Sequence, residues 1–252
     1  MSRPVVGLQL YTLRTVLSDD PAGVLRQVAE MGYEAVELAG FAGLTAEEFK
    51  AALDEAGLKA VSSHASLQQI EEDFDAVVAQ ARLFGYSYVG LGSVPAELRG
   101  SRENWVATAQ RLSEVGKKLR EEAGLTFFYH NHAFEFEEQY DNDYGLDLLY
   151  ANSDPQNLQA ELDTYWVQKG GENPVEYLQK YAGRTPILHI KDMGADGDFA
   201  EIGTGSLNWP AIFAAAEAGG VQAYIVEQDT CPGNPLDSVR ISIENLKKMG
   251  KV

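Results

Sequence analysis

The sequence of 252 residues predicts an α/β protein, a closed (β/α)8 TIM barrel that forms a single domain over residues 1–252. Three observations predict this fold. Short runs rich in β-branched and aromatic residues recur along the whole chain. Amphipathic stretches with helical spacing separate them. No linker or change in composition divides the sequence into parts.

The β-rich runs are expected to be buried parallel strands, because they are apolar on both faces. In chain order they are residues 5–11, 34–39, 59–65, 88–93, 125–132, 158–165, 186–192 and 223–229.

The stretches between the strands carry helix start and stop signals. Thr45 with Glu48 three residues later forms a capping-box pattern, and Gly57 ends that segment. The same plan, apolar spacing followed by a glycine, predicts further helices. They are the segments PAGVLRQVAEMG, DAVVAQARLFG, SRENWVATAQRLSEVGKKLREEAG, NPVEYLQKYAG, NWPAIFAAAEAGG and PLDSVRISIENLKKMG.

Strand–helix alternation implies parallel pairing through right-handed crossovers. Eight such units in a chain of this length favour a closed barrel. A doubly wound open sheet is the alternative, but it would more usually show fewer strands and a glycine-rich phosphate loop. The first strand is followed by no GxGxxG, and the chain has no GKS or GKT.

Polar residues gather where the predicted strands end, which is the face that carries the active site in such barrels. All four histidines of the chain lie at these ends. The polar and aromatic residues there are Gln9, Tyr11, Arg14, Glu37, His64, His130, Asn131, His132, Glu135, Glu161, Asp163, Tyr165, Trp166, His189, Lys191, Asp192, Glu227, Gln228 and Asp229.

The twofold period of a strand places several of these side chains on shared faces, such as His130 with His132 and Glu227 with Asp229. If those faces line the barrel mouth, clustered carboxylates would repel one another unless a cation lies among them. Mixed nitrogen and oxygen ligands suit Mn²⁺, Mg²⁺, Co²⁺, Fe²⁺ or Zn²⁺. Structural roles remain open: Asp192 and Asp229 could cap helices or anchor loops, and Glu161 could face a helix.

With these residues in place, the chain resembles the sugar phosphate isomerase/epimerase superfamily, the xylose isomerase-like TIM barrels that include AP endonuclease family 2. The resemblance rests on QLYTLR, SSHA, YHNHAFEF, LDTYW, LHIKDM and VEQD at the ends of six strands. It implies one divalent metal ion, with Mn²⁺ favoured, held by four side chains from the fifth to the eighth strand.

Carried over to this sequence, the resemblance makes Asp163, His189 and Glu227 metal ligands. The fourth position departs from the pattern, because relatives often have glutamate where His130 stands. Either Glu135 folds back to complete the site or His130 is the ligand. We favour Glu135, since a further anionic ligand suits Mn²⁺ or Mg²⁺ and leaves His132 free as a base.

The expected reaction is isomerisation or epimerisation of a sugar by α-proton abstraction and a metal-stabilised enediolate. His132, His130 or Glu227 would transfer the proton, and Lys191 would stabilise the developing oxyanion. Gln9, Glu37, His64 and Trp166 would bind the substrate. The alternatives are a dehydratase or lyase acting on a keto-inositol or 3-keto-sugar by the same first step, and a non-catalytic sugar-binding barrel.

The formal net charge of −18 argues against a nucleic-acid partner or an anionic membrane, and so against AP endonuclease activity. The single Cys231 and the absence of a secretory pattern at the start are typical of a cytoplasmic protein. No apolar run approaches the ~18 residues of a membrane span. We expect a small sugar or cyclitol as the partner, and homo-oligomerisation remains open.

The segment EIGTGSLNW, residues 201–209, lies where barrels often bind phosphate through backbone amides. Its two glycines could admit a phosphate, but a tight turn before the next helix is the preferred interpretation.

Overall fold

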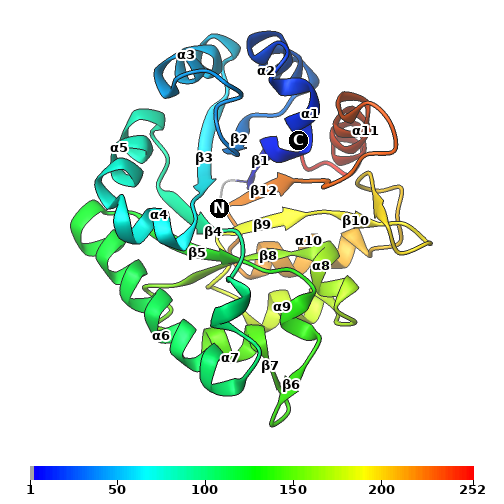
Figure 1. The fold of residues 1–252 in the computed structure, drawn as a ribbon. Coiled ribbons are helices and arrows are strands. Elements are labelled where there is room, and N and C mark those ends of the chain that lie inside the picture. The colour runs from blue at the N-terminus through cyan, green and yellow to red at the C-terminus, as the bar shows by residue number, and fades with distance from the viewer. Residues whose placement is uncertain (1–2) are drawn as a thin grey trace.

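The computed structural model describes residues 3–252 and contains a closed barrel of parallel strands surrounded by helices (Figure 1). The strands follow one another around the barrel in the order β1-β12-β9-β8-β5-β4-β3-β2. Their bounds are β1 Val5–Gln9, β2 Ala35–Leu38, β3 Lys59–His64, β4 Tyr88–Leu91, β5 Thr126–His130, β8 Gln159–Asp163, β9 Ile187–Ile190 and β12 Ala223–Val226. Each lies within one of the predicted runs, so the predicted fold class is confirmed.

The outer helices also follow the sequence signals. They are α2 Pro21–Met31, α3 Ala46–Ala56, α5 Phe74–Phe84, α6 Arg102–Lys118, α9 Pro174–Lys180, α10 Trp209–Ala218 and α11 Pro235–Lys248. At the start of α3, Thr45 and Glu48 form the predicted capping box. Gly57 ends that helix in the left-handed region at φ +76°, which costs glycine little.

Several short elements were not predicted, because none is long enough to show an apolar period. The helical ones are α1 Arg14–Leu17, α4 Leu67–Glu72, α7 Gly145–Ala151, α8 Thr164–Lys169 and the 3₁₀ turns η1 Leu10–Leu13, η2 Ala96–Leu98 and η4 Phe134–Phe136. The π-helical segment η3 Leu119–Ala123 continues α6 and lies within the predicted helical segment. The extended ones are the hairpins β6 Gln139–Tyr140 with β7 Asp143–Tyr144, and β10 Asp192–Met193 with β11 Phe199–Ala200.

All eight strands are shorter than the predicted runs, and in two of them a side chain at the strand end begins a helical segment. The run 158–165 stops at Asp163, because the Asp163 side chain accepts the N–H of Trp166 and begins α8. The run 5–11 stops at Gln9, whose side chain accepts the N–H of Tyr11 and begins η1. Tyr165 therefore lies on a helix and does not share a strand face with Asp163.

The barrel interior changes from apolar to polar along its axis. Phe128, Ile187, Ala223 and Ile225 form a buried apolar cluster. His64 packs against the ring of Phe128 with centroids 5.6 Å apart, so the polar side chains begin directly next to this cluster. Gly90 makes room there, since a Cβ at this position would lie 2.2 Å from the Phe128 ring. The apolar layer thus supports the polar residues from below.

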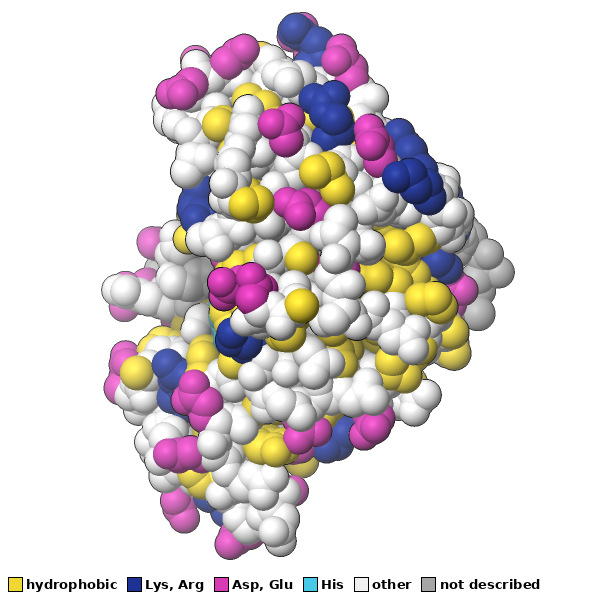
Figure 2. All heavy atoms as spheres, turned by 90° about the vertical axis from the view of Figure 1, so that its right-hand side faces the viewer, with side chains coloured by type: hydrophobic (Ala, Val, Ile, Leu, Met, Phe, Trp, Pro, Cys, Tyr) yellow, Lys and Arg dark blue, Asp and Glu magenta, His cyan; other side chains and the backbone are white. Residues whose placement is uncertain are grey.

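The outside of the molecule carries both signs of charge. Acidic and basic side chains are interspersed over the face shown in Figure 2. Among the helices of residues 3–252, none is long and apolar enough to cross a membrane.

Candidate active site

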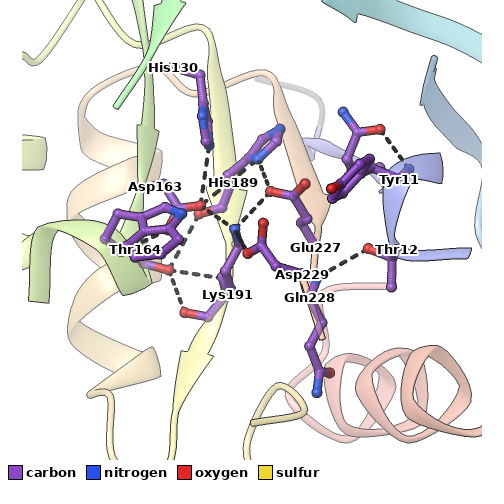
Figure 3. Close-up of polar contacts among 12 residues, drawn as sticks. Tyr11, Thr12, His130, Asp163, Thr164, His189, Lys191, Glu227, Gln228 and Asp229 are labelled. Carbon is purple, nitrogen blue, oxygen red and sulfur yellow. Dashed lines mark hydrogen bonds and ion pairs between the residues drawn. The ribbon is translucent and has the colours of Figure 1, made fainter. Parts of the chain in front are cut away.

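Four neighbouring strands supply most of the polar residues at the carboxyl end of the barrel. β5, β8, β9 and β12 are consecutive around the barrel, and their register pairs His130 with Glu161 and Asp163 with His189. Lys191 directly follows β9, and Glu227 directly follows β12. Side chains from four separate segments of the sequence therefore meet over one opening (Figure 3).

His130, Asp163, His189 and Glu227, here called the mouth cluster, each present a ligand atom within 4.8 Å of the others. His130 Nε2 lies 3.3 Å from Asp163 Oδ2, and His189 Nδ1 lies 3.0 Å from Glu227 Oε2. All four residues are buried. Two imidazoles and two carboxylates in this arrangement suit Zn²⁺, Mn²⁺, Co²⁺ or Fe²⁺. The residues therefore fit a divalent ion.

Asp163 is held in place by its own backbone surroundings. Its Oδ1 accepts the N–H of Trp166 at 2.9 Å, while its backbone N–H donates to Asn131 Oδ1 at 3.0 Å. One carboxylate oxygen is thus used to begin α8, and Oδ2 is left facing the mouth cluster.

Lys191 brings a fixed positive charge to the mouth cluster. Its Nζ lies 3.1 Å from Asp163 Oδ2, 2.8 Å from Glu227 Oε2 and 2.7 Å from Asp229 Oδ2, and the side chain is fully buried (Figure 3). Burial alone would lower the pKa of Lys191, but the nearby carboxylates outweigh it and raise that pKa. The ammonium group also holds the pKa of Asp163 and Glu227 below their usual values against the opposing effect of burial.

A second group of titratable side chains, here called the deep cluster, consists of Glu37, His64 and Glu161 around Nε2 of His189. His64 Nε2 lies 2.9 Å from Glu161 Oε2 and 3.2 Å from Glu37 Oε1. His189 Nε2 lies 2.9 Å from Glu37 Oε1. Burial would lower the pKa of His64, but the two carboxylates outweigh it and raise the pKa to about 8.

Sequence reasoning did not assign Glu161 to a site, although its place two residues before Asp163 on one strand was the available signal. Glu161 lies on the same face of β8 as Asp163, one step deeper in the barrel. It points inward to the imidazoles of His64 and His189 rather than towards a helix.

The structure does not place Glu135, which we favoured as the fourth ligand, in the mouth cluster. Glu135 is buried in η4 and accepts hydrogen bonds from the Tyr129 hydroxyl and, at 2.9 Å, from the His132 N–H. Both of its oxygens are thereby engaged in fixing the loop that follows β5. Burial raises the pKa of Glu135 to about 8, against the lowering effect of the Tyr129 hydrogen bond. His130, rather than Glu135, lies together with Asp163, His189 and Glu227.

Aromatic side chains line the mouth beside His132. The His132 ring lies 5.3 Å from Trp166 and 5.6 Å from Phe134, and the Phe199 ring lies 5.6 Å from Trp166. His132 Nδ1 and Trp166 Nε1 are buried atoms without a hydrogen-bond partner. Burial, and then the charges of His130 and Lys191, lower the pKa of His132 to about 3, so the ring is neutral near pH 7. An aromatic wall with two unused polar atoms can receive a polar ring such as a sugar.

Three of the residues expected to bind substrate lie below the mouth. Gln9 and Glu37 are buried, and Gln9 Nε2 donates to Glu37 Oε1 at 2.5 Å. His64, with a side chain 24% exposed, contacts Glu37 and Glu161. Glu37 and His64 belong to the deep cluster, and Gln9 contacts this cluster through Glu37. Trp166 belongs instead to the aromatic side chains beside His132.

The glycine-containing loop 201–209 already surrounds a carboxylate of the chain itself. The buried Asp192 accepts hydrogen bonds from the backbone N–H groups of Gly203, Gly205 and Leu207 at 2.8 to 3.2 Å. It also accepts from the Trp209 indole at 2.8 Å and from the Met193 N–H at 2.8 Å. Asp192 is therefore a loop anchor, and the amides that could bind a phosphate are occupied.

Comparison with known proteins agrees with the fold. The sequence profile of the family described as xylose isomerase-like TIM barrel matches residues 25–249. A sugar phosphate isomerase/epimerase from Parabacteroides distasonis has the same fold with a TM-score of 0.87 and 28% identity, and the alignment covers all of both chains.

Curated relatives include inosose dehydratases. That of Clostridium beijerinckii is 27% identical over 158 residues, which are 54% of this chain and 52% of the relative. That of Geobacillus kaustophilus is 24% identical over 90% of this chain and 86% of the relative. In the Clostridium matches the chain spans about half the length of the relative.

Proposed function

Because the chain belongs to the xylose isomerase-like TIM-barrel family, we propose that it is a divalent-metal-dependent isomerase or epimerase of a sugar or cyclitol. The first step is removal of the proton on the carbon next to a carbonyl group. The observation that carries this proposal is the mouth cluster, where two imidazoles and two carboxylates converge at the carboxyl end of the barrel.

A divalent ion held by His130, Asp163, His189 and Glu227 would polarise the carbonyl and make the neighbouring C–H more acidic. Within the chain, the imidazole of His132 is the proposed base, since its buried Nδ1 has no hydrogen-bond partner and its ring lies 5.3 Å from that of Trp166 beside the mouth cluster. His130 and Glu227 are less suited to that task because their ligand atoms face the ion.

Lys191 and Trp166 would position the substrate. The Lys191 ammonium lies 5.4 Å from the centre of the Trp166 ring, so a sugar that stacks on the indole comes within reach of its charge. Lys191 would donate a hydrogen bond to the oxygen on which negative charge develops. The Trp166 N–H would donate to a hydroxyl group, because burial leaves it without a partner in the protein.

Dehydration of a keto-inositol is the second candidate, and the similarity to inosose dehydratases favours it over other lyase reactions. It begins with the same proton removal and then expels a hydroxyl group from the next carbon. His132, once protonated, could return its proton to that leaving group. Both candidate reactions therefore need the same proton removal at the mouth cluster, and they differ only in the step that follows it.

The test is solvent exchange at the α-carbon. The protein, stripped with a chelator and reloaded with Mn²⁺, Co²⁺ or Zn²⁺, is incubated in D₂O with ketoses and keto-inositols, and deuterium uptake is followed by mass spectrometry. We expect uptake with at least one substrate in the reloaded protein, and none in the stripped protein or in Asp163→Asn. Epimers or an isomeric product would identify the first candidate, and a loss of water the second. No uptake in any reloaded form would leave a sugar-binding barrel as the better description.

A further inference from the structure

Among residues 3–252, no lysine or arginine lies beside the two carboxylates of the deep cluster. Glu37 and Glu161 are both 0% exposed. Within residues 3–252 their ion-pair partners are the imidazoles of His64 and His189. The mouth cluster differs, because Lys191 supplies it with a permanent positive charge. Buried carboxylates need a compensating cation, since an unpaired charge in the protein interior is costly.

The spacing of the ligand atoms matches that of a small divalent ion. A tetrahedral ion with metal–ligand distances of about 2.0 Å holds its ligand atoms about 3.3 Å apart. In the deep cluster, His64 Nε2 lies 3.2 Å from Glu37 Oε1 and 2.9 Å from Glu161 Oε2. His189 Nε2 lies 2.9 Å from Glu37 Oε1 and 3.3 Å from Glu161 Oε1. His64 Nε2 and an oxygen of each of Glu37 and Glu161 lie within 4.8 Å of one another and of His189 Nε2, which keeps its proton and is not a ligand when Nδ1 binds the mouth ion.

An unused oxygen gives a second, independent indication. Glu161 Oε1 is a fully buried carboxylate oxygen that receives no hydrogen bond, although it lies 3.3 Å from His189 Nε2 in the same group of atoms. The other oxygen of this carboxylate is paired with His64 Nε2. Buried carboxylate oxygens are rarely left without a partner, and a cation in the deep cluster would supply one.

His189 cannot compensate the deep cluster while it serves the mouth cluster. Its Nδ1 faces Glu227, and its Nε2 faces Glu37. If Nδ1 binds an ion at the mouth, as proposed above, the imidazole ring is neutral and its one proton lies on Nε2, which faces the deep cluster. His64 is then the one imidazole left to balance two carboxylates.

We propose that Glu37, His64 and Glu161 hold a second divalent ion, with zinc-like tetrahedral preference, directly beneath the catalytic one. His189 lies between the two sites, with Nδ1 on one side and Nε2 on the other. The deep ion neutralises the barrel interior and fixes the orientation of His189. The presence of two ions at once rests on the proposed mouth site, whereas the deep site itself does not.

The test is metal stoichiometry, measured without any substrate. The full chain is stripped with a chelator and titrated with Zn²⁺ by calorimetry, and elemental analysis follows gel filtration. We expect about two ions per chain in the wild type. Glu161→Gln, which keeps the shape of the side chain, should bind about one, and so should Asp163→Asn at the mouth. The double variant should bind neither. Asp147→Asn removes another largely buried carboxylate, outside the two clusters, and should still bind two.

The outcomes separate the two sites. One ion in the wild type that is lost in Asp163→Asn and unchanged in Glu161→Gln would overturn the deep site and leave the mouth site intact. One ion that is lost in Glu161→Gln and kept in Asp163→Asn would support the deep site and refute the mouth site. Circular dichroism of each variant shows whether a missing ion reflects a lost fold. The visible absorption of Co²⁺, bound in place of Zn²⁺, shows whether the ligands of the ion have changed.

Discussion

Asp192 allows a stability prediction that can be worked out from its contacts. Its buried carboxylate accepts five N–H groups, from Met193, Gly203, Gly205, Leu207 and the Trp209 indole. Asp192→Ala removes every acceptor at once. The Trp209 residue is 3% exposed, so its N–H would lose its partner without gaining water, at a cost of roughly 1–3 kcal/mol. The loop amides are nearer to solvent, and water recovers part of their cost.

Taken together, these contacts give an expected loss of about 3 kcal/mol in the free energy of unfolding for Asp192→Ala. Asp192→Asn keeps one acceptor oxygen and should lose about half as much. The measurement is urea unfolding followed by circular dichroism. The control is Asp196→Ala, which removes an exposed carboxylate of the neighbouring turn between β10 and β11 that accepts one N–H, from Asp198. If Asp192→Ala and Asp196→Ala differed by less than about 1 kcal/mol, the carboxylate would not be the anchor of this loop.

Three further predictions concern the mouth and its surroundings. Lys191→Met should lower the free energy of unfolding of the chelator-treated protein by about 3–5 kcal/mol, because it leaves buried carboxylates without their cation. In urea unfolding, added Mn²⁺ should restore most of this lost stability. Equal losses with and without Mn²⁺ would contradict the charge argument. Glu135 has a folded pKa of about 8, raised from 4.5, so its contribution to stability is present at low pH and is lost as the pH rises towards 8. As the pH rises from 4.5 to about 8, the unfolding free energy of the wild type should therefore fall relative to that of Glu135→Gln, by a few kcal/mol at most. If the unfolding free energies of the two proteins changed in parallel with pH, burial would not raise the pKa of Glu135. Trp166→Phe keeps the ring but removes the unpartnered N–H, so KM for the substrate should rise about tenfold at unchanged metal content, and an unchanged KM would remove the indole from substrate binding.

The architecture was predictable because it is encoded locally. Each barrel strand is a short apolar run, and each long helix shows its own capping residue or terminal glycine. The place of Asp163, His189 and Glu227 followed from the rule that barrel strands present polar residues at their carboxyl ends. These features depend on residues close together in the sequence and on a general property of the fold.

The exact partners of each side chain were not predictable, because they depend on depth within the barrel. Glu135 and His130 could both reach the mouth on sequence grounds. The 3₁₀ turn at Phe134–Phe136 directs Glu135 to Tyr129 instead. Gln9, Glu37 and His64 were expected to touch substrate, yet they lie one layer lower and contact one another or Glu161. Likewise, the anchoring of loop 201–209 by Asp192 joins residues at least 11 positions apart.

The most direct test of the central claim is the affinity of the chain for Mn²⁺ in His130→Ala and Glu135→Gln, measured by electron paramagnetic resonance of free Mn²⁺. If His130, Asp163, His189 and Glu227 hold the ion, His130→Ala should weaken Mn²⁺ binding at the mouth by at least about 100-fold. This effect is larger than the one expected when a residue that only hydrogen-bonds to a ligand is removed. Glu135→Gln should bind Mn²⁺ like the wild type. Wild-type affinity in His130→Ala together with lost binding in Glu135→Gln would contradict the account and return the fourth ligand position to Glu135.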